Sequence, residues 1–218
     1  MKKRLLVAML AITALCLCAC GDNNVSDTKN QTTETTVTEE DTQEEVTDDV
    51  EADDAEEAPS PEKVKFDEAS VATFEVTSDD LHDGVWDTTI TKTTNGLNVS
   101  PQLSWEAVEG AESYVIYMVD NTASGWLHWI SNDVTETELP QGWADESEYV
   151  GPYPPSGTHE YEIYVIALKE PVSSVNGNFD NVNIFFDDHK FDCDMNDDGE
   201  SGNILAFGTI TGTYTAGE

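Results

Sequence analysis

Residues 98–105 read NVSPQLSW, and they open the ordered series of motifs that decides the fold of this chain. Asp120 follows at the end of a strand-like run, and the sequence GWLHW then surrounds His128. The series continues with GPYPPSGTHEY at residues 151–161 and closes with ILAFGTITGTY at residues 204–214. Each motif alone is a weak signal. All five, in this order and at this spacing, indicate one folded unit.

The sequence around these motifs is strand-like. Short runs rich in β-branched and aromatic residues are separated by Asn, Gly, Pro and Asp, which favour turns. The runs are VATFEVT (71–77), SYVIYMV (113–119), WLHWIS (126–131), YEIYVIAL (161–168) and residues 204–214. No amphipathic helical stretch of comparable length occurs, although residues 173–190 have room for a short helix. The pattern predicts an all-β domain with minor helix, folded as a two-sheet antiparallel β-sandwich.

The N-terminal residues predict a signal peptide and a lipid anchor. Three basic residues at positions 2–4 precede an apolar run at 5–17, which is too short to span a bilayer. The run leads into LCAC, a lipoprotein-type signal whose last cysteine is Cys20. We therefore expect a signal peptide at residues 1–20 and lipidation of Cys20 at the extracytoplasmic face of a bacterial cell membrane. Ordinary signal cleavage beside incidental cysteines is the alternative.

Residues 21–64 predict an acidic tether. Sixteen of the 45 acidic residues fall here, among many threonines and without one aromatic residue. Such a stretch lacks the apolar surface that offsets the chain entropy lost on folding, so we expect it to be disordered and extended by charge repulsion.

Residues 65–218 form about one domain's worth of chain, with a strongly negative charge. They carry 29 acidic residues against four lysines and no arginine, which argues against binding to nucleic acid or to anionic lipid surfaces. We expect contact with the membrane through the lipid anchor only. Cys193 is the one cysteine in this part, so the domain has no internal disulfide and depends on core packing.

The five motifs resemble those of the phosphatidylethanolamine-binding protein family, specifically its bacterial YbhB/YbcL or Raf-kinase-inhibitor-like branch, from about Phe74 to Tyr214. The resemblance implies a two-sheet β-sandwich with a small anion pocket at one end. It also implies a binding protein rather than an enzyme, with a phosphate or a phospholipid head group as the small anionic or zwitterionic ligand. A lipoprotein that faces outward would not meet cytosolic kinases, so the kinase-inhibitor label is carried as a family name only.

The resemblance places the pocket on matching positions of this sequence. Asp120 falls on the first Asp of the family's D-P-D-A-P motif, and His159 with Tyr161 falls on its H-R-Y motif. Imidazole N–H, phenol O–H and backbone N–H groups are suitable donors for a phosphate, and Asp120 could fix the tautomer of a neighbouring histidine. The complete set implied for ligand binding is Asp120, Trp126, His128, Pro154, Pro155, His159 and Tyr161.

Two positions depart from the family pattern. The second Asp of D-P-D-A-P is Thr122, and the Arg of H-R-Y is Glu160. We hypothesise that the loss of the second Asp is the matching change to the loss of the Arg, because that Arg can no longer form an ion pair. This matched-replacement hypothesis requires Thr122 and Glu160 to be neighbours in the fold. Because the domain has no arginine, we expect weak anion binding or a preference for neutral or zwitterionic ligands.

Two other functions are compatible with parts of the sequence. Residues 103–120 and 161–170 resemble strands of a fibronectin type III module, which would make the domain an adhesion or spacer element without a pocket. Asp120, His128 and His159 are also the residue types of a two-histidine, one-carboxylate metal site, as in a metal-dependent enzyme.

A calcium loop is a further alternative. Asp194, Asn196, Asp198 and Gly199 have the spacing that opens an EF-hand loop, but the twelfth position is Leu205 where a bidentate Glu is expected. We therefore favour a solvated acidic loop and expect no cofactor, with calcium as the alternative.

Overall fold

The computed structural model describes residues 66–217, and its longest strands coincide with the runs of β-branched and aromatic residues. These strands are β6 (Ser113–Asp120), β7 (Trp126–Val134), β9 (Thr158–Leu168) and β11 (Ile204–Thr215). The predicted signal peptide, the lipidation site Cys20 and the tether all lie outside the described residues.

The remaining elements are short. The other strands are β1 (Ala72–Thr73), β2 (Val76–Thr77), β3 (Leu81–His82), β4 (Val85–Trp86), β5 (Leu103–Trp105), β8 (Glu138–Leu139) and β10 (Asn181–Val182). The helix α1 (Phe186–His189) lies inside the stretch 173–190, where a short helix was predicted. Within the described part of the chain, no helix is long and apolar enough to cross a membrane.

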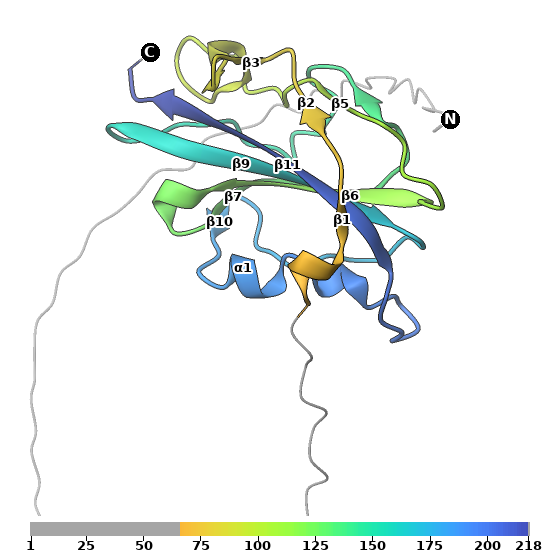
Figure 1. Cartoon of the computed structure of the whole chain (residues 1–218). Coiled ribbons are helices and arrows are strands. Elements are labelled where there is room, and N and C mark those ends of the chain that lie inside the picture. The colour runs from red at the N-terminus through yellow and green to blue at the C-terminus, as the bar shows by residue number, and fades with distance from the viewer. Residues whose placement is uncertain (1–65, 218) are drawn as a thin grey trace, which may run out of the picture. The chain divides into compact units, whose positions relative to one another are not determined.

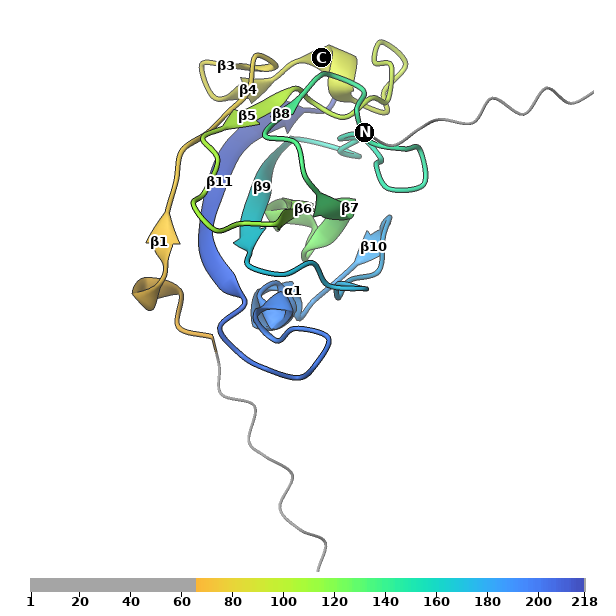
Figure 2. The same cartoon turned by 90° about the vertical axis from the view of Figure 1, so that its right-hand side faces the viewer.

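The strands form two sheets (Figure 1). The large sheet has the order β10-β7-β6-β9-β11-β4-β3, and β1 also pairs with β11. The small sheet has the order β2-β5-β8 and is antiparallel. Figure 2 shows β1 beside β11 at one side of the large sheet and β10 beyond β7 at the other. The predicted all-β, two-sheet fold with minor helix is confirmed.

Two details of the prediction are corrected. β1 and β4 run parallel to β11, so the large sheet is mixed rather than antiparallel. The run 71–77 is not one strand, because β1 joins the large sheet whereas β2 joins the small one. A strand of two residues carries too little sequence pattern to predict its direction or its partner strand. Both depend on where the chain crosses from one sheet to the other.

The large sheet is buried on both faces. One face packs against the small sheet, where Ile163 and Val165 of β9 share a core with Leu103 and Leu139. The other face is covered by the segment that contains α1, whose Phe186 packs in a second core. Burial on both faces explains why all eight residues of β6 are buried and why its sequence lacks polar alternation.

Cys193 belongs to this second core, and it is the free cysteine among the described residues. Burial raises the pKa of its thiol to about 12. The group therefore stays a protonated, unreactive thiol at neutral pH, as expected of a structural residue.

Candidate functional site

Asp120 is the last residue of β6 and is only 3% exposed. One carboxylate oxygen, Oδ1, accepts hydrogen bonds from the backbone N–H groups of Thr122 (2.8 Å) and Ala123 (2.9 Å). These bonds cap the 3-10 turn that follows the strand and fix the side chain. The other oxygen, Oδ2, lies 2.7 Å from Nδ1 of His159 on the neighbouring strand β9. The turn therefore aims the carboxylate at His159.

His128 lies on β7 and is 3% exposed. Its Nδ1 is 2.8 Å from the carbonyl oxygen of Val150, and since a carbonyl can only accept, Nδ1 carries the proton. Burial lowers the pKa of His128, although the bond to Val150 and the charge of Asp120 oppose that shift. The ring is therefore neutral at pH 7, and its Nε2 carries a lone pair.

Tyr161 is fully buried between the two histidines. Its ring centroid lies 5.3 Å from that of His128 and 6.4 Å from that of His159. The hydroxyl makes no well-formed hydrogen bond among the described residues, although the Asp120 carboxylate is near enough for a weak one and for its charge to act on the hydroxyl. Burial first, and that charge second, raise the pKa of Tyr161, so its hydroxyl remains protonated. A buried donor without a well-formed hydrogen bond is uncommon in a folded interior.

These four side chains, Asp120, His128, His159 and Tyr161, are called the pocket cluster below. β6 and β9 are antiparallel, and their register sets Asp120 directly opposite Tyr161. His159 and Tyr161 lie on the same face of β9 because they are two residues apart. The structure thus brings together the four polar residues that the sequence motifs had singled out.

A second set of side chains borders the pocket cluster and is called the rim group: Lys92, Trp126, Tyr153 and Asp180. Trp126 Nε1 (3.2 Å) and the Tyr153 hydroxyl (3.0 Å) both donate to Asp180 Oδ1. The Lys92 ammonium lies 3.9 Å from Asp180 Oδ2 and 5.2 Å from the centroid of the Tyr153 ring. The Tyr153 ring also contacts His128, with 5.6 Å between the centroids.

Of the rim group, the sequence motifs predicted only Trp126. Tyr153 stands inside the motif GPYPP and could have been included on that ground. Lys92 and Asp180 lie in no motif, and they meet only because the loop before β10 folds back to Trp126. Burial, and then Asp180, raise the pKa of Tyr153 to about 12, so it too is protonated at neutral pH.

The motif that begins at Asn98 supports the proline loop. The Asn98 side-chain oxygen accepts a hydrogen bond from Gly151 N–H at 2.8 Å. The Pro152 carbonyl oxygen accepts another from Lys92 N–H at 3.0 Å. In the same loop Pro154 is half-buried and Pro155 is exposed. The loop that carries Tyr153 is therefore attached to the segment that carries Lys92.

The two departures from the family pattern are neighbours. The Thr122 hydroxyl oxygen accepts a hydrogen bond from Glu160 N–H at 3.0 Å. The Glu160 carboxylate accepts one from the Asn121 side chain at 3.4 Å. The proximity that the matched-replacement hypothesis requires is present.

In the acidic loop at 192–200, side-chain oxygens accept hydrogen bonds from backbone N–H groups of the loop and of the residues that follow it. Asp194 accepts from Gly202 N–H (3.2 Å) and Ile204 N–H (3.1 Å), and the Asn196 side chain accepts from Glu200 N–H (2.8 Å). Across residues 66–217, no three side chains of His, Cys, Asp or Glu are gathered in a way that could hold a metal ion. Calcium binding at Asp194, Asn196 and Asp198 stays an untested alternative.

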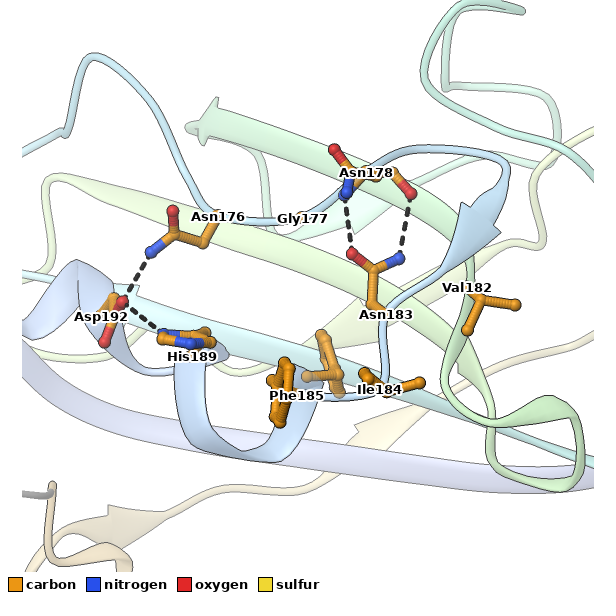
Figure 3. A pocket seen from close by; sticks show the side chains of 10 residues that line it. Asn176, Gly177, Asn178, Val182, Asn183, Ile184, Phe185, His189 and Asp192 are labelled. Carbon is orange, nitrogen blue, oxygen red and sulfur yellow. Dashed lines mark hydrogen bonds and ion pairs between the residues drawn. The ribbon is translucent and has the colours of Figure 1, made fainter.

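A cavity of about 520 Å³ lies beside β10 (Figure 3). Asn183 lines one side of the cavity. Its side chain accepts a hydrogen bond from the N–H of Asn178 and donates one to the C=O of the same residue. His189 and Asp192, joined at 3.0 Å, line another side. The lining residues are Asn176, Gly177, Asn178, Val182, Asn183, Ile184, Phe185, Phe186, His189 and Asp192. None of them belongs to the pocket cluster or the rim group.

Comparison with known proteins places these motifs in one family. A family model described as phosphatidylethanolamine-binding protein matches residues 77–215. The UPF0098 protein of Methanothermobacter thermautotrophicus is 34% identical over 97 residues, which cover 35% of this chain and 64% of that protein. The chain therefore spans less than two thirds of that relative.

Two solved structures are also similar. The phosphatidylethanolamine-binding protein homologue CT736 of Chlamydia trachomatis is 21% identical, with a TM-score of 0.48 over 65% of this chain and 97% of that one. Escherichia coli YbcL, described as a member of the mammalian PEBP family, is 24% identical, with a TM-score of 0.49 over 66% and 99%. Because both scores are below 0.5, the family assignment rests on the family model.

Proposed function

The chain belongs to the phosphatidylethanolamine-binding protein family, and from this premise we propose that residues 65–218 form a non-catalytic module that binds a small anionic or zwitterionic ligand. A phosphate or a phospholipid head group is the ligand class that fits. The observation that carries the proposal is the pocket cluster, in which the ring of buried Tyr161 contacts two histidines and its hydroxyl makes no well-formed hydrogen bond. A ligand oxygen at this point would accept a well-formed hydrogen bond from Tyr161.

The charges around the pocket cluster support weak rather than tight anion binding. Lys92 is the one cation of the rim group, and Asp180 already faces it. Asp120 adds a second carboxylate beside the histidines, and this one is buried. A ligand with little net charge, or a zwitterion whose cation meets Asp180, is therefore favoured over a multiply charged anion.

The proposal includes a lipid anchor at Cys20, supported by the LCAC sequence and the acidic stretch that follows it. The module then acts at the extracytoplasmic face of the membrane, without nucleic acid as a partner. Mass spectrometry of the mature N-terminus tests the anchor, because lipidated Cys20 carries a diacylglyceryl mass. Recovery of wild type and Cys20→Ala in the same soluble fraction would contradict it.

Titration of the full chain with phosphate and phosphoethanolamine tests the pocket. We expect weak, saturable binding that is lost in His159→Ala and reduced in Lys92→Ala. The matched control is Lys169→Ala, which removes the same charge from an exposed position after the far end of β9. Micromolar affinity for phosphate at physiological salt would contradict weak binding, and equal affinity in wild type and His159→Ala would contradict the site.

The fibronectin type III-like alternative has no remaining support. Both segments on which it rested, residues 103–120 and 161–170, fall inside the family match at residues 77–215.

A further inference from the structure

We propose that the cavity beside β10 is a second ligand site, and that it binds a small neutral saccharide. The proposal is independent of the proposed function, because none of the residues that line this cavity belongs to the pocket cluster or the rim group. Its volume of about 520 Å³ lies within the range of small-molecule sites. The side chains that line it suit an uncharged ligand with polar edges and apolar faces.

The polar end of the cavity is built by side chains that hold one another in place. The Asn176 amide donates to Asp192 Oδ2 at 2.6 Å, and Nδ1 of His189 lies 3.0 Å from the same oxygen. The loop that carries Asn176 is attached to the large sheet, because the Tyr117 hydroxyl donates to the Asn176 carbonyl oxygen at 3.0 Å. Figure 3 shows Asn176, His189 and Asp192 together at one end of the cavity. A ligand therefore meets polar groups that are already ordered.

Gly177 allows this loop to lie close against β7. Its φ is +134°, and a Cβ at this position would lie 2.5 Å from Leu127 Cδ1. Any other residue would push the loop away from the sheet and change the shape of the cavity. Asn183 holds the next part of the loop through its two bonds to the backbone of Asn178. The cavity is therefore a built feature of the fold.

Exposed carboxamides supply hydrogen bonding without charge. Asn176 and Asn178 are both exposed at the cavity, and the Asn178 side chain forms no hydrogen bond with another described residue. A carboxamide has two N–H donors and an acceptor oxygen, whichever way the group is turned. The hydroxyl groups of a sugar also donate and accept, so the match depends on the protonation state of neither partner.

The opposite end of the cavity is apolar and open to solvent. Ile184 is 69% exposed, Phe185 is 61% exposed and Val182 is 37% exposed. They are three of the seven large apolar side chains that are exposed in residues 66–217, so exposed apolar surface is concentrated at this cavity. The C–H face of a sugar ring packs well against an aromatic ring, whose face is electron-rich.

The charges favour a neutral ligand. Residues 65–218 carry 29 acidic residues against four lysines, so their field repels anions. A cation is the other alternative, but Asp192 is the one carboxylate among the described residues that line the cavity. Its Oδ2 already has the nitrogen atoms of Asn176 and His189 as neighbours.

Nuclear magnetic resonance of the full chain tests the site with glucose, cellobiose, N-acetylglucosamine and N,N′-diacetylchitobiose as neutral probes. We expect saturable binding of at least one probe, with a Kd on the order of 1 mM. Binding should shift the carboxamide signals of Asn176, Asn178 and Asn183. The affinity should not change when the salt concentration is raised from about 20 to about 500 mM, because the probes carry no charge.

Two substitutions with matched controls locate the binding. Phe185→Ala should weaken it roughly tenfold, whereas Phe185→Tyr keeps the ring and should bind like wild type. Asn178→Ala should weaken it roughly fivefold, because the carboxamide is lost. The controls are Leu97→Ala and Asn95→Ala, which remove an exposed apolar side chain and an exposed carboxamide that do not line this cavity. Both controls should bind like wild type.

Three outcomes would overturn the inference. The first is that none of the four saccharides binds at about 50 mM, and the second is equal affinity in wild type, Phe185→Ala and Asn178→Ala. The third is that the cavity signals respond only to tetralysine and only at low salt, which would assign the cavity to a basic partner. Phosphate titration reports on the pocket cluster, so a failure of the proposed function is detected separately.

Discussion

At the scale of single residues, Asp120 links the backbone to the site. Its Oδ1 caps the turn after β6, and its Oδ2 holds His159. A carboxylate serves both purposes because it has two separate acceptor oxygens. Asp120 therefore contributes both to the stability of the fold and to the orientation of the His159 imidazole. Two different substitutions of Asp120 can distinguish these contributions.

We expect Asp120→Ala to destabilise the fold by about 2 kcal/mol, because it removes the cap and leaves the partly buried Nδ1–H of His159 unpaired. Asp120→Asn should cost less, since its amide oxygen still caps the turn, but it should abolish the preference of His159 for the Nδ1–H tautomer. Urea unfolding measures the first effect, and imidazole nitrogen chemical shifts measure the second. Equal unfolding free energies for the two variants would contradict the capping role.

The buried His128 predicts a loss of stability in acid. Its folded pKa lies below the ordinary value, so below about pH 6.5 the unfolded chain binds a proton that the folded chain does not. The free energy of unfolding should therefore fall by up to about 1.4 kcal/mol per pH unit as the pH drops from 6.5 toward the folded pKa. Urea unfolding at pH 5 and pH 7 measures this.

His128→Asn should reduce that loss, whereas His82→Asn serves as a control because the His82 side chain is 67% exposed. The same acid sensitivity in His128→Asn and in wild type would mean that another group causes it.

At the scale of elements, α1 and its flanking segment cover the face of the large sheet that the small sheet leaves open. Phe186 packs against Tyr117 at 5.3 Å and Tyr164 at 5.7 Å between ring centroids. Its neighbour Phe185 points away from this core and is 61% exposed. Adjacent residues of one type thus occupy opposite environments.

Phe186→Ala should lower the free energy of unfolding by about 3 kcal/mol, because it opens a cavity in the second core. Phe185→Ala should change it by less than about 0.5 kcal/mol. Chemical denaturation of both variants makes the comparison, and similar losses in the two would contradict the assigned packing of α1.

The sequence predicted the long strands, because runs of β-branched and aromatic residues carry that information locally. The resemblance to the family, and not any local pattern, pointed to the four side chains that the fold gathers into the pocket cluster. On β9, Tyr161, Ile163, Val165 and Ala167 share one face in the sequence, and all four lie in the core against the small sheet. The split of residues 71–77 between two sheets was not predictable, since two-residue strands have no periodicity. Lys92 and Asp180 were missed because their contact joins loops 88 positions apart in the sequence.

At the scale of the whole molecule, charge should set how the pocket responds to salt. Residues 65–218 carry 29 acidic residues and four lysines, so their field repels an approaching anion. Added salt screens this repulsion. We expect the affinity for methyl phosphate to rise about two-fold between 20 and 150 mM of a salt whose anion does not compete. A fall in affinity over that range would instead indicate that attraction to Lys92 dominates.

The central claim is that Asp120, His128, His159 and Tyr161 form a ligand site, and imidazole NMR tests it most directly. The chain has four histidines, and His82 and His189 lie outside the site as internal controls. Titrating the full chain with methyl phosphate at pH 5.5 should shift the Nε2 signals of His128 and His159 and leave the other two unchanged. Shifts confined to His82 and His189, or no shift at millimolar ligand, would contradict the claim.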